Sequence, residues 1–305
     1  MVSSQYLLDA VRAVVLAGGF AVAAVSDLRT REVPERLWQV LGVVAFLLGA
    51  IVLAPGGTLP LLLWLLVGVW TVQQFFPWDD ALGPRLAAQA IRLELATYAA
   101  VLAVVAGAVV RWGIGPSAVP IPVVAVVVSV VTARLLFETP LHFGGADAMA
   151  VMAASLLVPV VAAPLLYAPA LAGAVASWMP FAVTMLTNAA LFAVLVPVFV
   201  AVRNASRGEF TLRRGFLSYT LPVEELPRRF VWVQDAPLDV DTMVDDADTS
   251  EEDTRRRTEL ARELEQRGVR QVWVTPQIPF LAFLAAGAIA GLLAGNLLLD
   301  LLLAL

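Results

Sequence analysis

The longest uncharged stretch of this chain, residues 148–202, constrains its fold more than any other feature. These 55 residues contain no Asp, Glu, Lys or Arg, so they cannot supply the polar surface that a water-soluble domain needs. A helix that crosses a bilayer takes about 20 apolar residues, so the stretch is too long for one crossing and long enough for two. Pro164, Pro169 and Pro180 are the predicted breaks between the two helices.

Eight segments of the chain meet the same criterion of about 18 to 22 apolar residues. Of all residues 60% are hydrophobic and the mean hydropathy is +0.84, which is more apolar than soluble domains are. The first segment is interpreted as a retained span, because Asp9 precedes its apolar run and no small-residue cleavage site is evident. The eight predicted spans are residues 7–26, 37–54, 59–76, 93–110, 119–137, 148–167, 180–202 and 278–299.

The placement of arginines predicts the orientation of these spans. Membrane proteins keep an excess of Lys and Arg in their short cytoplasmic loops. Five arginines lie in the loops after spans one and three, whereas the opposite side has only Arg111. We therefore expect a multi-pass plasma-membrane protein with its N-terminus outside and its odd-numbered loops in the cytoplasm. The five arginines are Arg29, Arg31, Arg36, Arg85 and Arg92.

One long polar loop, residues 203–277, follows the seventh span. Residues 230–234 and 269–275 alternate like short strands, and the charged run to Arg267, with Gly268 as the stop, is compatible with a helix between them. The predicted fold class is an all-α polytopic membrane protein of about eight transmembrane helices (six to eight) with a small cytoplasmic α/β subdomain in this loop. The predicted domains are residues 1–202, the loop 203–277, and a C-terminal transmembrane helix in residues 278–305.

Composition excludes several classes of function. The chain has no Cys and a single His, so disulfides, thiolate metal sites and a histidine metal cluster are ruled out. Its net charge is −5, which leaves no positive field for nucleic-acid binding. We therefore expect no metal, no cofactor and no nucleic-acid partner, and any catalysis must come from groups such as carboxylates.

Two aspartates at predicted membrane boundaries are the candidate reactive groups. Asp27 ends the first span and Asp147, 120 residues later, opens the sixth, so both fall at the cytoplasmic boundary. An ionised carboxylate is costly there. In the simpler interpretation, Asp27 only ends a span beside arginines. Against this interpretation, a carboxylate at a helix C-terminus is destabilised by the negative end of the helix dipole. Likewise, Asp147 could be a cap in the first turn of a helix.

The residues before Asp147 favour a chemical role. Gly144 and Gly145 precede Ala146, and a cap does not need two glycines, which instead let another backbone approach closely. Two carboxylates that share a proton have pKa values pushed apart. One can then activate a water to attack a peptide carbonyl while the other protonates the leaving amine. The pair Asp27 and Asp147 therefore predicts an aspartic endopeptidase.

Four short motifs give the chain a resemblance to archaeal preflagellin and prepilin peptidases, the membrane aspartic proteases of the type IV prepilin peptidase family. The similarity covers most of the chain, and the specificity comes from the order and membrane placement of the motifs. Ala146 fits the relaxed third position of the family pattern Gly-x-Gly-Asp. The matching parts are Asp27 with residues 29–34, residues 144–147, Pro180 to Asn188, and Thr275 to Phe280.

This resemblance implies a catalytic pair at Asp27 and Asp147 with an active-site loop of Gly144, Gly145 and Ala146. It also implies cleavage of short, positively charged leader peptides from pilin-like or archaellin precursors at the cytoplasmic face of the membrane. Archaeal members have about six spans, so residues 59–110 are expected to be an insertion. With no Cys, the zinc module of many bacterial relatives is absent, and methyltransferase activity is not expected.

A few further residues carry predictions. His142 and Arg134 are candidates for tuning the aspartate pair. Asn188, inside the seventh span, is expected to form a hydrogen bond between helices. Four tryptophans near span ends are expected to anchor the membrane interface: Trp38, Trp78, Trp112 and Trp178.

Two other functions remain open at this point. Paired carboxylates in a membrane protein also relay protons in coupled transporters. Against a transporter, the halves show no internal repeat and both acids sit at one boundary, not at the midplane. The third possibility is an inactive membrane scaffold whose acidic loop binds a partner.

Overall fold

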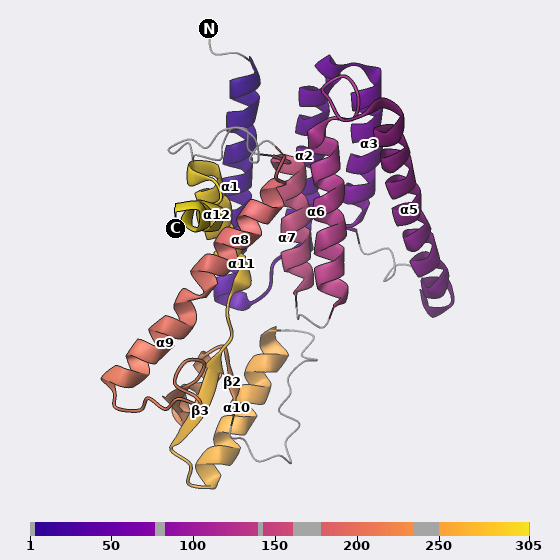
Figure 1. The fold of residues 1–305 in the computed structure, drawn as a ribbon. Coiled ribbons are helices and arrows are strands. Elements are labelled where there is room, and N and C mark those ends of the chain that lie inside the picture. The colour runs from indigo at the N-terminus through magenta and orange to yellow at the C-terminus, as the bar shows by residue number, and fades with distance from the viewer. Residues whose placement is uncertain (1–3, 77–82, 140–142, 161–177, 235–249, 305) are drawn as a thin grey trace. The chain divides into compact units, whose positions relative to one another are not determined.

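The computed structural model describes residues 4–76, 83–139, 143–160, 178–234 and 250–304, and it forms two compact units (Figure 1). The first unit consists of Met1–Asp27, Val33–Ala190 and Phe280–Leu305, and the second of Leu28–Glu32 and Leu191–Pro279. The predicted division at residues 202 and 277 concerns membrane crossing and stays a prediction.

Helices dominate the described residues, and three short strands come late in the chain. The helices are α1 (Ser4–Thr30), α2 (Glu35–Leu53), α3 (Thr58–Gln73), α5 (Gly83–Trp112), α6 (Ile121–Glu138), α7 (Gly145–Leu157), α8 (Phe181–Ala193), α9 (Leu195–Ser206), α10 (Ser250–Gln266), α11 (Phe280–Ala294) and α12 (Leu297–Ala304). The strands are β1 (Tyr219–Pro222), β2 (Val231–Val233) and β3 (Gln271–Pro276), and short 3-10 helices cover Ala54–Gly56 and Val223–Arg228.

The number of candidate membrane spans is lower than predicted. Among the described residues, five helices are long and apolar enough to cross a membrane: Tyr6–Thr30, Glu35–Gly56, Ile91–Trp112, Ile121–Glu138 and Phe181–Ser206. The predicted spans 59–76, 148–167 and 278–299 fall on the shorter apolar helices α3, α7 and α11. Counting apolar residues overestimated α7 and α11, because Pro159 follows α7 closely and Gly295, with φ 83°, follows α11. Residues 161–167 of the sixth predicted span lie outside the described residues.

Helix α7 lies at the centre of the first unit. It packs against α2, α6 and α11, and every residue from Ala150 to Leu157 is buried. Many of these residues are Ala or Ser, which let neighbouring helices approach closely. A helix that is apolar all round is a buried helix, so Asp147 sits in the first turn of the helix that the other helices surround.

Asn188 joins two helices, as the sequence predicts. Its side chain is fully buried. The Nδ2 group donates to the carbonyl oxygen of Gly295 at 2.9 Å, and Oδ1 accepts from the backbone N–H of Leu297 at 2.9 Å. This one amide therefore satisfies a carbonyl at the end of α11 and an N–H at the start of α12, both of which lack a partner within their own helices.

The expectation for the tryptophans is wrong at Trp38. Its side chain is fully buried, with its ring edge-on to Phe20 at 5.9 Å between centroids, because α2 turns this face toward α1. Trp112 and Trp178 are about half exposed, and Trp78 lies outside the described residues.

The second unit contains a three-stranded antiparallel sheet with the order β1-β3-β2. Strands β2 and β3 and helix α10 confirm the predicted strand–helix–strand pattern, and Gly268, with φ 76°, stands just past the end of α10. Strand β1 was not predicted, because it is only four residues long and ends in Pro222. Ala261 and Leu264 of α10 pack with Val272 and Val274 of β3 in a small apolar core.

Arg31 connects the segment Leu28–Glu32 to Phe230, which Arg257 of α10 also contacts. The Cζ atom of Arg31 lies 4.9 Å from the ring centroid, and that of Arg257 lies 4.8 Å from it. Arg31 also donates to the carbonyl oxygen of Gln277 at 2.9 Å. Its φ of 61° is in the left-handed region, so the chain accepts backbone strain to make these contacts.

Candidate functional site

Asp27 and Asp147 both belong to the first unit and lie close enough to interact. Asp27 sits in the last turns of α1 and Asp147 in the first turn of α7, and both side chains are partly buried. Burial is the main cause of the raised pKa of Asp147, and the negative charge of Asp27 raises it further. The fold therefore brings together two carboxylates that are 120 residues apart in sequence.

Asp147 does cap its own helix. Its Oδ2 atom accepts a hydrogen bond from the backbone N–H of Gly144, the residue that precedes α7, at 3.2 Å. This is the half of a capping box in which the third helical residue reaches back to the cap. The simpler interpretation of Asp147 as a cap is therefore confirmed. A capping carboxyl group can also have a second, chemical role.

The electrostatics of Asp147 point to such a second role. A carboxylate that only capped a helix would have a lowered pKa, because both the helix dipole and the hydrogen bond favour the charged form. Instead, burial raises the pKa of Asp147 to about 7, the hydrogen bond from Gly144 opposes this shift, and Asp27 adds to it. Asp147 stands before the predicted span 148–167 and outside the five candidate spans. Its carboxyl group therefore titrates near neutral pH.

The two glycines before Asp147 differ in what they do. Gly144 has φ −66° and ψ 151°, and neither Gly144 nor Gly145 is among the positive-φ residues, so a left-handed backbone is not the reason for either glycine. A Cβ atom added to Gly144 would lie 3.0 Å from Oδ2 of Asp147. At Gly145 it would lie 3.6 Å from the Phe137 ring, an ordinary contact. The steric constraint on the carboxylate is at Gly144.

An aromatic contact links the loop to the start of the last long helix. The rings of Phe143 and Phe280 meet edge to face with centroids 5.8 Å apart. Phe280 closes the Thr275–Phe280 motif, and Phe143 precedes the Gly144–Asp147 motif. Sequence patterns singled out both motifs without predicting that they touch, since nothing in their local periodicity indicates a partner. Ala146 packs partly buried against the same core.

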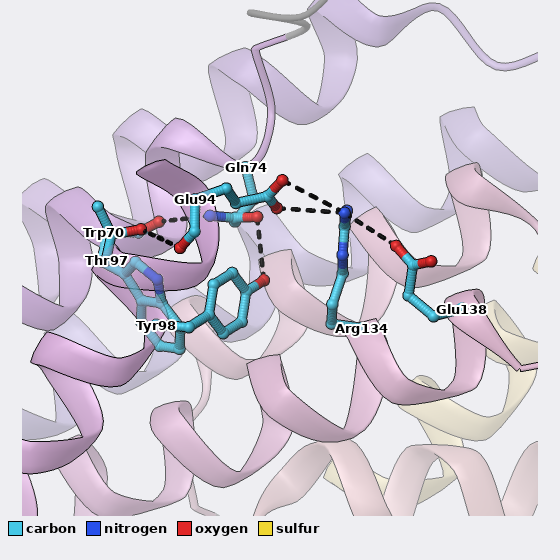
Figure 2. A network of polar contacts seen from close by, with 7 residues as sticks. All are labelled: Trp70, Gln74, Glu94, Thr97, Tyr98, Arg134 and Glu138. Carbon is cyan, nitrogen blue, oxygen red and sulfur yellow. Dashed lines mark hydrogen bonds and ion pairs between the residues drawn. The ribbon is translucent and has the colours of Figure 1, made fainter. Parts of the chain in front are cut away.

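Arg134 is held in a network of polar contacts (Figure 2). Its Nη2 atom lies 3.2 Å from the Glu94 carboxylate on α5 and 2.9 Å from that of Glu138 on α6. On the α5 side, the Tyr98 hydroxyl donates to Gln74 at 3.0 Å. Glu138 is therefore an ion-pair partner, which its position at a span end did not reveal.

Arg134 is connected to the candidate site through the Phe137 ring. Its Cζ atom lies 5.6 Å from the centroid of the Phe137 ring, and that ring borders Gly145. A tuning role for Arg134 stays a prediction. His142, the other tuning candidate, lies outside the described residues. Within the ranges that the structure describes, no group of three His, Cys, Asp or Glu side chains could hold a metal ion.

Comparisons with known proteins do not add a relative. No protein-family model matches the sequence, and no curated protein matches it with significant similarity. The function is therefore inferred from the geometry of the two aspartates and from the resemblance of the short motifs.

The pKa of Asp147 predicts an unusual dependence of stability on pH. With a folded-state pKa of about 7 against an ordinary value of 3.8, the folded protein binds this proton more tightly than the unfolded chain. Its contribution to stability is therefore lost as pH rises from about 4 to about 7. Asp147→Asn keeps a hydrogen-bond acceptor for Gly144 without the charge, so we expect a higher melting temperature than wild type at pH 8 and a smaller difference at pH 5. Thermal melts of the detergent-solubilised proteins at both pH values measure this difference. If Asp147→Asn had a lower melting temperature than wild type by the same amount at pH 8 and at pH 5, Asp147 would be only a cap.

Proposed function

We propose that this protein is a membrane aspartic endopeptidase that removes short, positively charged leader peptides from archaellin or type IV prepilin-like precursors at the cytoplasmic face. One observation carries the proposal: Asp27 and Asp147, far apart in sequence, interact electrostatically at the helix ends of one unit, and Asp147 titrates near neutrality. The motif resemblance supplies the substrate class.

In the proposed mechanism, Asp147 holds the proton that the pair shares and Asp27 is the ionised partner. Asp27 takes a proton from a water molecule, whose oxygen attacks the scissile carbonyl. Asp147 then protonates the leaving amine. A pKa near 7 suits a general acid that works at neutral pH.

The location of the pair favours a peptidase over a proton-coupled transporter. Transport sites lie near the bilayer midplane, between helices that alternate in their exposure. Asp27 and Asp147 instead sit in terminal turns of α1 and α7, where an extended precursor segment can enter from the aqueous side.

Co-expression with a pilin-like precursor tests the proposal. We expect a faster-migrating product on a gel, and N-terminal sequencing should place the cut after the charged leader. Purified protein reconstituted in vesicles with an internal pH-sensitive dye provides the test of the alternative. Proton flux without precursor cleavage would support the transporter and contradict the peptidase.

The proposed orientation has its own test. The chain has no Cys, so single-cysteine variants can be labelled without background. Ser117 is exposed in the connection between α5 and α6, and Glu259 is exposed on α10. With intact cells and a membrane-impermeant maleimide, Ser117→Cys should react, whereas Glu259→Cys should react only after permeabilisation. The reverse pattern would invert the topology and place the second unit outside the cell.

A further inference from the structure

The turn that follows α9 exposes four bulky apolar side chains. Leu212 is 84% exposed and Leu217 62%, and Phe210 and Phe216 are also exposed. Contiguous exposed apolar groups on a folded unit mark an interaction surface. We call residues 207–218 the α9 turn.

Close contacts with α9 and within the turn hold the α9 turn in one conformation. The buried side chain of Asn204 donates to the carbonyl oxygens of Gly215 at 2.9 Å and Ser218 at 2.7 Å. The rings of Phe210 and Phe216 meet edge to face at 5.3 Å between centroids. A Cβ atom on Gly215 would come within 2.6 Å of both Phe210 and the carbonyl oxygen of Thr211, so the turn is closely packed. It therefore holds its apolar side chains outward in a defined shape.

The apolar surface continues onto α9. Exposed side chains recur there at spacings of three and four residues, which places them on one face. Val200 and Asn204 occupy the opposite face and are buried. The exposed side chains of α9 are Leu195, Val198, Phe199 and Val202.

The candidate span that contains α9 ends directly before the α9 turn. This span, Phe181–Ser206, consists of α8 and α9, and the ends of a membrane span lie where the hydrocarbon core meets the headgroups. Its C-terminal end therefore reaches the headgroup layer. The α9 turn begins at the next residue.

The charges of the α9 turn complement an anionic surface. Arg207 and Arg213 are exposed. Arg214 lies with its Cζ atom 5.7 Å from the Trp273 ring centroid. The one acid of the turn, Glu209, accepts a hydrogen bond from Thr220 at 2.6 Å. Arginines beside exposed apolar groups are the composition that binds the headgroup boundary of anionic membranes.

We propose that the α9 turn binds the anionic phospholipid surface of the membrane, with Leu212 and Leu217 inserted at the boundary between headgroups and acyl chains and Arg213 facing the phosphates. This contact holds the second unit at the membrane surface. It stands independently of the proposed peptidase activity.

Fluorescent labelling of the full chain tests the proposal. We would attach an environment-sensitive nitrobenzoxadiazole probe to Leu212→Cys, to Leu217→Cys and, as the matched control on the same unit, to Glu259→Cys. Each protein is reconstituted in phosphatidylcholine vesicles with about one third phosphatidylglycerol. A second set of vesicles also contains phospholipid with a nitroxide near the top of its acyl chain.

We expect blue-shifted emission at 212 and 217, with at least about twofold more nitroxide quenching than at 259. Adding Arg213→Gln to the Leu212→Cys protein should reduce this quenching. Quenching at 212 and 217 that does not exceed that at 259 would overturn the proposal. So would a blue shift without quenching, since another protein surface, such as a second copy, would then cover the turn.

Discussion

Asp27→Asn and Asp147→Asn are each expected to lower the rate of precursor cleavage by about 10²–10⁴-fold, the contribution of a general acid or base. Neither change alters side-chain volume appreciably, and the amide at 147 can still accept the hydrogen bond from Gly144. Expression and membrane insertion should therefore be unchanged. Cleavage of a purified precursor by protein in detergent, followed on gels over time, measures the effect.

Two controls make this result specific. Asp9 lies on the same helix as Asp27 and pairs with Arg12 at 3.7 Å, away from Asp147 in sequence and in its contacts. We expect Asp9→Asn to cleave at the wild-type rate. Because the two aspartates act as one unit, the double variant Asp27→Asn with Asp147→Asn should be hardly slower than either single variant. A single variant that keeps wild-type activity would remove that residue from the catalytic pair.

The two glycines before Asp147 should respond differently to the same substitution. Gly144→Ala places a methyl group against Oδ2 of Asp147, so the carboxylate must shift or lose its hydrogen bond. Because a displacement of about 1 Å at a reacting group costs on the order of a hundredfold in rate, we expect roughly tenfold slower cleavage for Gly144→Ala and about a hundredfold for Gly144→Val.

Gly145→Ala is the matched control one residue away. The added methyl group meets only the Phe137 ring at an ordinary distance, and alanine is the better helix former by about 0.5–1 kcal/mol. We expect cleavage within about twofold of wild type and a slightly higher melting temperature. If Gly144→Ala were as active as Gly145→Ala, the glycines would serve only the entry into α7, and the argument for close packing around the carboxylate would fail.

Several features of the fold follow from local patterns alone. The described parts of the eight apolar segments fall largely on helices, because a mostly apolar run has no other way to satisfy its backbone in lipid. The alternation in residues 230–234 and 269–275 and the glycine at 268 likewise mark β2, β3 and the end of α10. These signals are local in sequence, so they can be read without knowing which elements meet.

Helix lengths and partners depended on information that is not local. The short α7 and α11 were predicted too long, because a single Pro or Gly ends a helix that composition would continue. Trp38 lies near a span end like an interfacial tryptophan, yet it is buried against Phe20. Only the packing of α1 on α2 decides which side of α2 is buried.

At the candidate site, the sequence by itself determined which residues are chemically suited: two boundary aspartates and a small-residue loop in a chain without Cys. The tertiary structure decided that Asp27 acts on Asp147, that burial outweighs the Gly144 hydrogen bond in setting the pKa of Asp147, and that Gly144 is the glycine in contact with the carboxylate. It also decided that Arg134 pairs with Glu94, 40 residues away. Charge interactions and desolvation depend on distance and burial in space, which sequence spacing does not encode.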